Sequence, residues 1–255
     1  MDLQLKGKKV LITGGSKGIG QACAQVMAAE GCGTIHLAAR NEEDLMNAKL
    51  KIQSEYTASV EIHPVDLSLG DNIRALAQAC GDIDILVNNA GAIPNGDLLS
   101  IDEDTWRKAW DLKIFGYINL CRAVYPNMKA KGKGVIVNII GAAGERPNFF
   151  YIAGGAGNAS LMAFTKALGS RSLKDGIRVV AINPGLITTQ RLERQMRRNA
   201  ERKLGDPDRW RELLPDDPPP GEPSDIANMT AFLASDLAKN INATVITIDG
   251  GSSKR

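Results

Sequence analysis

The chain alternates short apolar runs with longer amphipathic stretches. Seven runs rich in aliphatic and β-branched residues predict β-strands: Lys9–Thr13, Thr34–Ala39, Val60–Val65, Ile83–Asn88, Val135–Ile140, Ile177–Asn183 and Thr244–Asp249. Because most of these runs lack polar alternation, we expect parallel strands buried on both faces. Helical stretches lie between them, near residues 18–30, 41–55, 70–80, 103–131, 155–175 and 224–235. This order predicts right-handed βαβ units and an α/β fold, a doubly wound parallel sheet of seven strands with helices on both faces.

The domain organisation follows from the absence of any linker, repeat or composition shift. We therefore predict that residues 1–255 form a single domain. The exception to the regular rhythm is residues 186–223, inserted between the sixth strand and the last helix. This segment begins with the charged run RLERQMRRNAERK and ends in the proline-rich PDDPPPGEP. Long insertions in compact domains are more often lids or binding loops than scaffold, so we expect a lid here.

Composition and charge exclude several classes of protein. The 31 Lys and Arg residues against 29 Asp and Glu leave a net charge of +2, which argues against a nucleic-acid binder. No apolar run approaches the roughly 20 residues needed to span a bilayer, and the first ten residues lack a signal-peptide core, so we expect no membrane partner and a cytoplasmic protein. The cysteines are scattered, without metal-ligand or redox spacing: Cys23, Cys32, Cys80 and Cys121. We expect no metal site, and we interpret His36 and His63 as structural.

A glycine-rich loop directly after the first strand carries the clearest chemical signal. Its residues are Thr13, Gly14, Gly15, Ser16, Lys17, Gly18, Ile19 and Gly20, and they open a helix. Glycines in this position allow a tight turn and a close approach of the backbone to a pyrophosphate on the helix N-terminus. The order of strand, glycines and helix therefore predicts a dinucleotide site, with a purely structural turn as the alternative.

The end of the second strand bears on which dinucleotide is bound. An NAD enzyme usually has an acidic residue here for the ribose 2′-hydroxyl, but this chain has Ala39, Arg40 and Asn41. Arg40 and the nearby Lys17 are two cations that suit a 2′-phosphate, so NADP(H) is favoured over NAD(H). The alternative is that Arg40 is only a solvated cap of the next helix.

Together these motifs resemble the short-chain dehydrogenase/reductase (SDR) family over nearly the whole chain, which implies a Rossmann fold. The glycine loop matches the family's TGxxxGxG, Asn88 to Gly91 match its NNAG, and Asp249 to Gly251 match its closing DGG. The resemblance adds further cofactor-binding residues: Asp66, Leu67, Asn89, Ala90, Gly91, Pro184, Gly185, Ile187 and Thr189. It also implies a homodimer or homotetramer formed through the two long helices.

The catalytic end departs from the family pattern. SDR enzymes use an Asn-Ser-Tyr-Lys set, in which the Tyr hydroxyl exchanges a proton with the substrate oxygen. Aligning the flanking motifs places Lys113 at the Asn position, Gly141 at Ser, Gly154 at Tyr and Asn158 at Lys. The chain's one Tyr-x-x-x-Lys, at Tyr125 and Lys129, lies outside these aligned positions. The standard mechanism therefore cannot be transferred.

Three interpretations of this site stay open. In the first, the site is rebuilt as an oxidoreductase for a small carbonyl or alcohol: Lys113 and Asn158 exchange places, and Tyr151 exchanges the proton with Lys113 lowering its pKa. Against it stands the view that Lys113 reaches solvent and Tyr151 packs at an oligomer surface. In the second, the protein is a catalytically silent NAD(P)-binding sensor, scaffold or subunit partner. In the third, a lyase or isomerase uses Lys113 as a base.

Residues near the site supply further candidates. Gly154, Gly155 and Gly157 begin a long helix, which indicates close approach of a cofactor, substrate or neighbouring subunit, or a loosened helix start. Glu145 and Arg146 follow the fifth strand and could serve in acid–base work.

The inserted segment carries its charges at helical spacing. The basic residues are Arg191, Arg194, Arg197, Arg198, Arg202 and Lys203. They indicate either an anionic substrate under a basic lid or a solvated face partly neutralised by Glu193 and Glu201. Leu192, Met196 and Trp210 would form the apolar side that closes over the pocket.

Overall fold

The core of the protein is one continuous parallel sheet. A computed structural model describes residues 2–254. Its strands are β1 (Lys9–Thr13), β2 (Thr34–Ala39), β3 (Ser59–Pro64), β4 (Ile85–Asn88), β5 (Gly134–Ile139), β6 (Ile177–Pro184) and β7 (Val245–Ile248). They pair in the order β3-β2-β1-β4-β5-β6-β7, and every pair is parallel. The predicted doubly wound sheet is confirmed, and its order reverses between β1 and β4, where such folds bind ligands.

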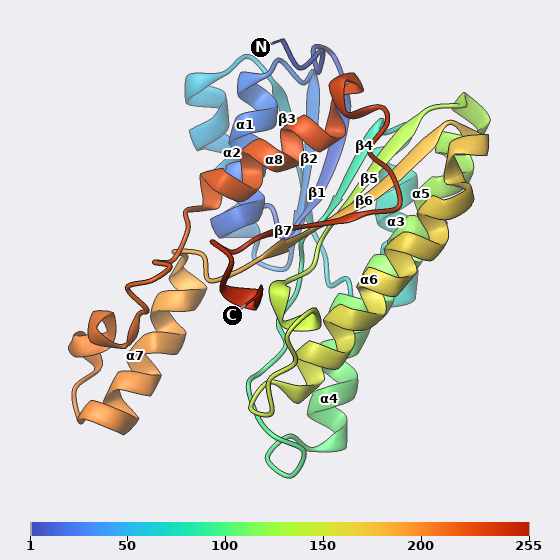
Figure 1. Cartoon of the computed structure of the whole chain (residues 1–255). Helices are drawn as coiled ribbons and strands as arrows, with labels where there is room; N and C mark the ends of the chain where they lie inside the picture. Colours follow the sequence, from blue (N-terminus) through green and yellow to red (C-terminus); the bar gives the residue numbers. More distant parts are fainter. Residues whose placement is uncertain (1, 255) are drawn as a thin grey trace.

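Helices cover both faces of the sheet (Figure 1). On one face lie α1 (Gly18–Ala29), α2 (Glu42–Glu55) and α8 (Pro223–Ala234), packed on inward side chains such as Val10 and Ile12. On the other face lie α3 (Gly70–Cys80), α5 (Gly116–Lys131) and α6 (Ile152–Ser172). Successive residues of β1 point to opposite layers, so its unbroken apolar run fills both cores.

The stretch predicted as one helix over 103–131 is interrupted in the structure. Helix α4 (Glu103–Trp110) leads into a π-helical turn at Asp111–Phe115, and α5 follows without a break in the chain. Turns of this kind occur mostly as single interruptions of α-helices and are frequent at functional sites. The turn carries Lys113 and brings it into the interior.

The segment between β6 and α8 forms a separate arm. It contains α7 (Gln190–Leu204) and a 3-10 turn at Pro207–Leu213, which pack against each other. Thr189 is the N-cap of α7, since its hydroxyl accepts a hydrogen bond from the Leu192 amide at 3.2 Å. Figure 1 shows this arm and α4 projecting on either side of the C-terminus. Within residues 2–254, no helix combines the length and the apolar character needed to cross a membrane.

Candidate active site

The glycine loop lies at the carboxyl end of β1 and is closed by β4. Gly14 and Gly18 have φ angles of 64° and 54°, and a Cβ atom at Gly20 would overlap the Gly14 carbonyl oxygen. The Asn89 amide holds the loop by donating to the carbonyl oxygens of Thr13 at 3.0 Å and Gly14 at 3.3 Å. Lys17, at the N-cap of α1, makes no side-chain capping bond. The first amides of α1 are therefore open to a pyrophosphate, and these residues fit a dinucleotide.

The loop after β6 completes the same groove. The Thr189 side chain lies beside Gly18, where an added Cβ would be 3.2 Å from Thr189 Cγ2. Gly185 packs so closely on Asp249 that a Cβ there would lie 2.6 Å from Asp249 Cβ. Pro184 is buried at the end of β6, and Ile187 is anchored by a bridge to Gly221. The two loops that the motifs assigned to the cofactor are thus adjacent.

At the end of β2, the structure places carboxylates beside the two cations that the sequence predicted, Lys17 and Arg40. Arg40 is exposed, and its charge contributes to lowering the pKa of Asp66, after the larger effect of hydrogen bonds from Ser68. Lys17, however, forms a 2.7 Å ion pair with Asp44 in the first turn of α2. The expectation of two cations without a carboxylate is therefore corrected. Asn41 caps α2 by accepting from the Asp44 amide at 2.7 Å.

Leu67 follows Asp66 and is buried in the core beneath this edge, and Ala90 packs against the same core. Ser16 and Ile19 lie in the glycine loop and the first turn of α1 and are partly exposed. These positions line the region that the resemblance assigns to the cofactor.

Lys113 is buried rather than directed to solvent. Its side chain is 8% exposed, and the ammonium donates to the Ile140 carbonyl oxygen at 2.6 Å. The close passage of this side chain requires glycine at position 91, because a Cβ there would lie 2.7 Å from Lys113 Cδ. Burial, and after it the charge of Arg191, lower the pKa of Lys113 to about 7. The structure therefore contradicts the alternative in which Lys113 reaches solvent.

Tyr151 fills the volume beside the Cα atom of Gly154. A Cβ atom built on Gly154 would overlap the Tyr151 ring. The backbone holds this arrangement, since Gly96 donates to the Phe150 carbonyl at 2.8 Å and forms a bridge with Tyr151. Burial raises the pKa of Tyr151, and the charge and hydrogen bonding of Arg191 oppose that rise. The cation acting on Tyr151 is thus Arg191, whereas Lys113 binds a backbone carbonyl.

Asn158 is a residue of α6, and its side chain contacts Gly141 in the loop after β5. Its side chain is 2% exposed, and its amide nitrogen donates to the Gly141 carbonyl at 3.3 Å. Its Oδ1 atom is buried and has no hydrogen-bond partner among the described residues. Gly141 has a φ of 141°, and a Cβ there would lie 2.8 Å from the Asn158 nitrogen. Gly141 and Asn158 are therefore in direct contact.

Gly154 and Gly157, at the start of α6, are in close contact with side chains of the same chain. Gly154 accommodates Tyr151, and a Cβ at Gly157 would lie 2.8 Å from Ile114 Cδ1. The Trp110 indole donates to the Ala153 carbonyl at 3.0 Å and fixes α6 against α4. Close approach, one of the explanations that the sequence left open, is thus intramolecular at these positions.

Arg191 connects the arm to the site. Its guanidinium donates to the carbonyl oxygens of Gly91 at 2.9 Å and Ile93 at 3.3 Å. Arg197 instead pairs with Glu193 at 2.9 Å and Asp208 at 2.5 Å within the arm. Helical spacing placed these arginines in one group, whereas the structure divides them between the site and the arm. The only available signal was the position of Arg191 directly after the cofactor loop.

In the rest of the arm, basic side chains are exposed and apolar side chains are buried or half-buried. Arg194, Arg198, Arg202 and Lys203 are exposed. Leu192 and Trp210 are buried and Met196 is half-buried, and α7 packs against the 3-10 turn. The exposure of these basic side chains fits the solvated-face interpretation at most positions of α7.

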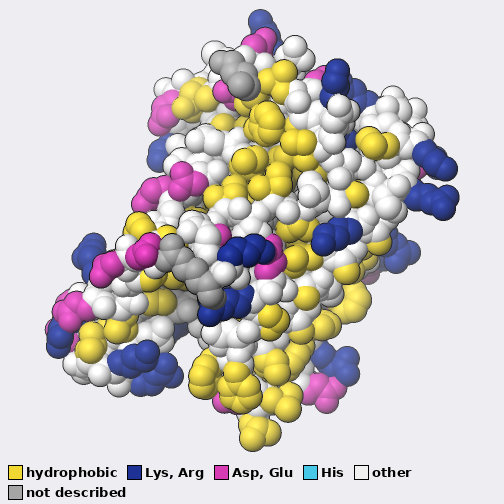
Figure 2. Space-filling view, viewed as in Figure 1, with side chains coloured by type: hydrophobic (Ala, Val, Ile, Leu, Met, Phe, Trp, Pro, Cys, Tyr) yellow, Lys and Arg dark blue, Asp and Glu magenta, His cyan; other side chains and the backbone are white. Residues whose placement is uncertain are grey.

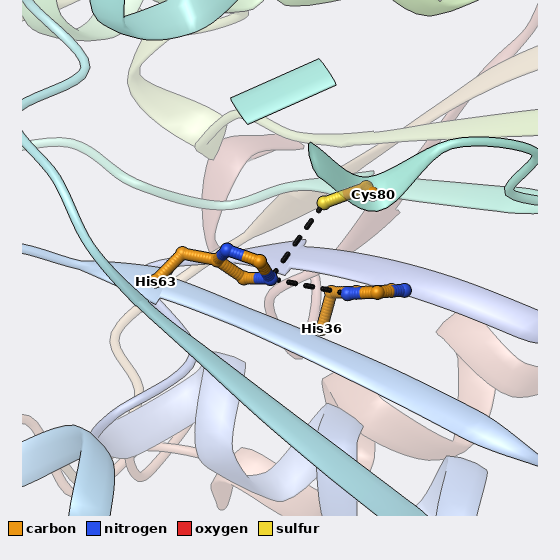
Figure 3. A group of neighbouring side chains, drawn as sticks. All are labelled: His36, His63 and Cys80. Carbon is orange, nitrogen blue, oxygen red and sulfur yellow. Dashed lines mark hydrogen bonds between the residues drawn. The ribbon is translucent and has the colours of Figure 1, made fainter. Parts of the chain in front are cut away.

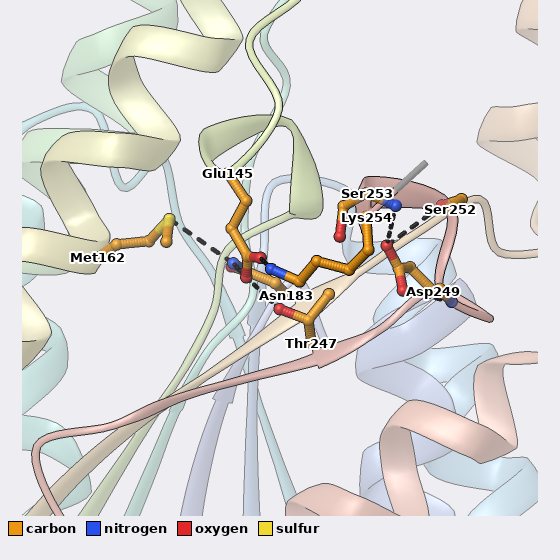
Figure 4. A network of polar contacts seen from close by, with 9 residues as sticks. Glu145, Met162, Asn183, Thr247, Asp249, Ser252, Ser253 and Lys254 are labelled. Atoms are coloured by element: carbon orange, nitrogen blue, oxygen red, sulfur yellow. Dashed lines mark hydrogen bonds and ion pairs between the residues drawn. The ribbon is translucent and has the colours of Figure 1, made fainter.

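The C-terminal segment contacts Glu145 (Figure 4) and also Arg146. Glu145 Oε1 accepts from Asn183 at 2.9 Å and from the Thr247 hydroxyl, and Oε2 pairs with Lys254 at 2.6 Å. These donors, Lys254 first, hold the pKa of Glu145 below its usual range. Arg146 donates to the Ser252 carbonyl at 3.0 Å. Both residues therefore tie the β5–α6 loop to the C-terminus and are poorly suited to proton transfer.

Comparison with known proteins agrees with this geometry. A family model for short chain dehydrogenases matches residues 8–200. The 2-keto-3-deoxy-L-fuconate dehydrogenase of Xanthomonas campestris is 30% identical, covering 97% of this chain and 81% of that protein. A 3-oxoacyl-[acyl-carrier-protein] reductase of Chlamydia muridarum is 31% identical, covering 98% and 99%.

Solved structures give the same result. The L-sorbose reductase of Gluconobacter frateurii, determined with NADPH and L-sorbose, superposes with a TM-score of 0.92 at 31% identity and covers 100% of both chains. Levodione reductase superposes with a TM-score of 0.91 at 30% identity, covering 98% of this chain and 99% of that one. The sheet order, the glycine loop and these matches lead to one conclusion: the chain belongs to the short-chain dehydrogenase family of oxidoreductases.

Proposed function

We propose that the protein transfers a hydride between NADP(H) and a small carbonyl or alcohol substrate, with Tyr151 as the proton-exchanging group. The observation that carries this proposal is the overlap between the Tyr151 ring and any side chain at Gly154. The resemblance to the SDR family assigns the catalytic Tyr to position 154. The phenol thus enters the same region from one helical turn earlier in the chain.

Each group in the pocket has a distinct task in this proposal. A bound nicotinamide cofactor supplies or accepts the hydride. The Tyr151 hydroxyl donates a proton to the substrate oxygen during reduction and takes it back during oxidation. Arg191 stabilises the tyrosinate that forms, since its charge already opposes the rise in the Tyr151 pKa. Lys113, with a pKa of about 7, can return a proton to the pocket near neutral pH.

The preference for NADP(H) rests on Arg40. It is exposed directly after β2, where a ribose 2′-phosphate would lie, and no carboxylate occupies positions 38–41. The pairing of Lys17 with Asp44 leaves Arg40 as the main phosphate ligand. The L-sorbose reductase structure contains NADPH, and a putative 2-deoxy-D-gluconate 3-dehydrogenase from Agrobacterium tumefaciens contains NADP, which supports this assignment.

The substrate is proposed to be small and to carry an anionic group. Arg191 lies beside Tyr151 and supplies the positive charge for such a group. Exposed apolar side chains lie on the loops that position Tyr151: Leu98, Leu99, Phe149 and Phe150. Figure 2 shows hydrophobic side chains gathered at the tip of the molecule that carries α4. A substrate would thus meet an apolar wall on one side and the Arg191 guanidinium on the other.

We further propose a homodimer or homotetramer. An open groove of about 550 Å³ lies beside α4. Apolar side chains, among them Trp106, Trp110 and Phe115, line it together with the charged Glu103, Arg107 and Asp111. Burial of such a surface against a second copy would be favourable, because exposed apolar patches of this kind mark interaction sites. Sedimentation equilibrium of the intact chain tests the assembly.

The test of the function is the steady-state kinetics of Tyr151→Phe. The substrate panel comprises small ketones, keto acids and sugars with NADPH, and the corresponding alcohols with NADP. Loss of the hydroxyl should lower kcat by about a hundredfold to ten-thousandfold, the usual contribution of a general acid. The matched control is Tyr125→Phe. Tyr125 lies in the later part of α5, and its hydroxyl donates to Asp175, which follows α6.

The alternatives are separated by the same experiment. Unchanged turnover in Tyr151→Phe overturns the assignment of the proton donor. Tight NADPH binding by the wild type without turnover across the panel indicates the silent NAD(P)-binding protein. Substrate conversion without a change in nicotinamide absorbance indicates a lyase or isomerase.

A further inference from the structure

A cluster of two histidines and a cysteine lies at the edge of the sheet, apart from the proposed active site. His36 comes from β2, His63 from β3, and Cys80 is the last residue of α3. His36 Nδ1 lies 3.1 Å from His63 Nε2, and Cys80 Sγ lies 3.8 Å from the same His63 atom. Figure 3 shows the three side chains pointing toward one another. The residues are 27 and 17 positions apart in the chain, so their spacing gave no sign of the cluster.

The distances fit a tetrahedral metal ion. Zinc binds imidazole nitrogen at about 2.0–2.1 Å and thiolate at about 2.3 Å, which places two such nitrogens about 3.4 Å apart and a nitrogen and a sulfur about 3.6 Å apart. The three candidate ligand atoms all lie within 4.8 Å of one another. The two measured distances, 3.1 Å and 3.8 Å, are within a few tenths of an ångström of these values, and the third, at most 4.8 Å, would have to shorten by up to about 1 Å.

A fourth ligand is available on the open side. The Glu61 carboxylate lies 3.4 Å from His36 Nδ1, and the two residues are direct partners in the β2–β3 register. His36 and Cys80 are 4% and 6% exposed, whereas the Glu61 side chain is 54% exposed. The site is thus closed by core residues on one side and reached from solvent past Glu61.

We propose that His36, His63, Cys80 and Glu61 form a binding site for a zinc-class divalent ion that cross-links β2, β3 and α3. This expectation replaces the sequence-based one of no metal site. A His₂Cys set with a carboxylate combines soft and borderline ligands, which favours zinc over magnesium or calcium. Binding forms bonds to the two imidazole nitrogens, the carboxylate and the thiolate, and it releases the thiol proton to solvent. The proton shared by the two histidines moves to the other nitrogen of its ring.

The test is a titration of the full chain, without an affinity tag, with Co²⁺ as the spectroscopic probe. One equivalent should produce the visible bands of tetrahedral cobalt and a near-ultraviolet sulfur-to-cobalt charge-transfer band. Zn²⁺ should abolish both by displacement and raise the midpoint of thermal unfolding by several degrees. In Cys80→Ser the charge-transfer band should disappear and the affinity should fall at least tenfold. Glu61→Gln should weaken binding and retain the band.

The matched control is Cys32→Ser, which alters another buried cysteine on the opposite face of the sheet. This variant should keep the cobalt spectrum of the wild type. If Cys80→Ser does not fold, His63→Gln replaces it, because His63 is half-buried and its loss should also remove the tetrahedral bands. The proposal is overturned if the wild type gives no tetrahedral spectrum, or if the folded Cys80→Ser or His63→Gln variant gives the wild-type one.

Discussion

Tyr151 and Gly154 occupy one shared volume: the phenol ring lies where a side chain on Gly154 would have to begin. The glycine is therefore a requirement of the tyrosine's position. Gly91 and Lys113 stand in the same relation, since the lysine stem passes over the bare Cα atom. In both pairs, a small residue in one element accepts a functional side chain from another.

This relation makes Gly154→Ala a sensitive test of Tyr151. Alanine normally stabilises a helix by up to about 1 kcal/mol relative to glycine, but here the methyl group would displace the ring. We expect turnover to fall at least tenfold and the midpoint of thermal unfolding not to rise. Gly155→Ala is the control, because its added Cβ would be no closer than 3.4 Å to a neighbouring atom. Equal activity in both variants would show that the ring position is irrelevant.

The buried Lys113 should make stability depend on pH. Its pKa is 10.5 when unfolded and about 7 when folded, so between these values the unfolded state binds more protons. The free energy of unfolding should therefore rise with pH from 7 to 10, by an amount on the order of a few kcal/mol relative to Lys113→Met. Urea unfolding of both proteins at several pH values measures this difference. Exposed Lys166→Met should follow the wild-type curve, and parallel curves for all three would contradict the burial of an uncharged Lys113.

Arg40 should discriminate between the two cofactors. Arg40→Ala removes a cation from the 2′-phosphate, and we expect the Kd for NADPH to rise about tenfold while that for NADH changes little. Fluorescence titration at fixed ionic strength measures both constants. Asp44→Asn should act in the opposite direction, because it releases Lys17 from its ion pair. Arg74→Ala, an exposed arginine paired with Asp71, serves as the control. Equal weakening of both cofactors would place Arg40 away from the phosphate.

A serine at position 141 should destabilise this chain. Gly141 has a φ of 141°, and a side chain there would meet the Asn158 nitrogen. We expect Gly141→Ser to cost about 1–3 kcal/mol. Asn158→Ala should cost little, because it also removes an unpartnered buried oxygen. In the double variant the two changes should partly compensate, and a double-mutant cycle from chemical unfolding measures this coupling. Strict additivity would show that the contact carries no energy.

Much of the molecule was determined by the sequence itself. Seven apolar runs predicted seven strands within a few residues, because burial on both faces leaves a local signal in each run. The sequence also predicted the glycine loop and the motif from Asn88 to Gly91. The turn needs positive φ at Gly14 and Gly18, and this conformation favours glycine, so the turn is visible in the sequence.

The tertiary structure alone decided which side chains meet. It buried Lys113, separated Arg191 from Arg197, and joined His36 and His63 to Cys80. Periodicity does not predict these contacts. The contacting residues lie on different elements, and Arg191 and Arg197 lie on one helix but point to different partners. A strand or helix reveals its burial through its own pattern, whereas a site depends on distances between elements that only packing sets.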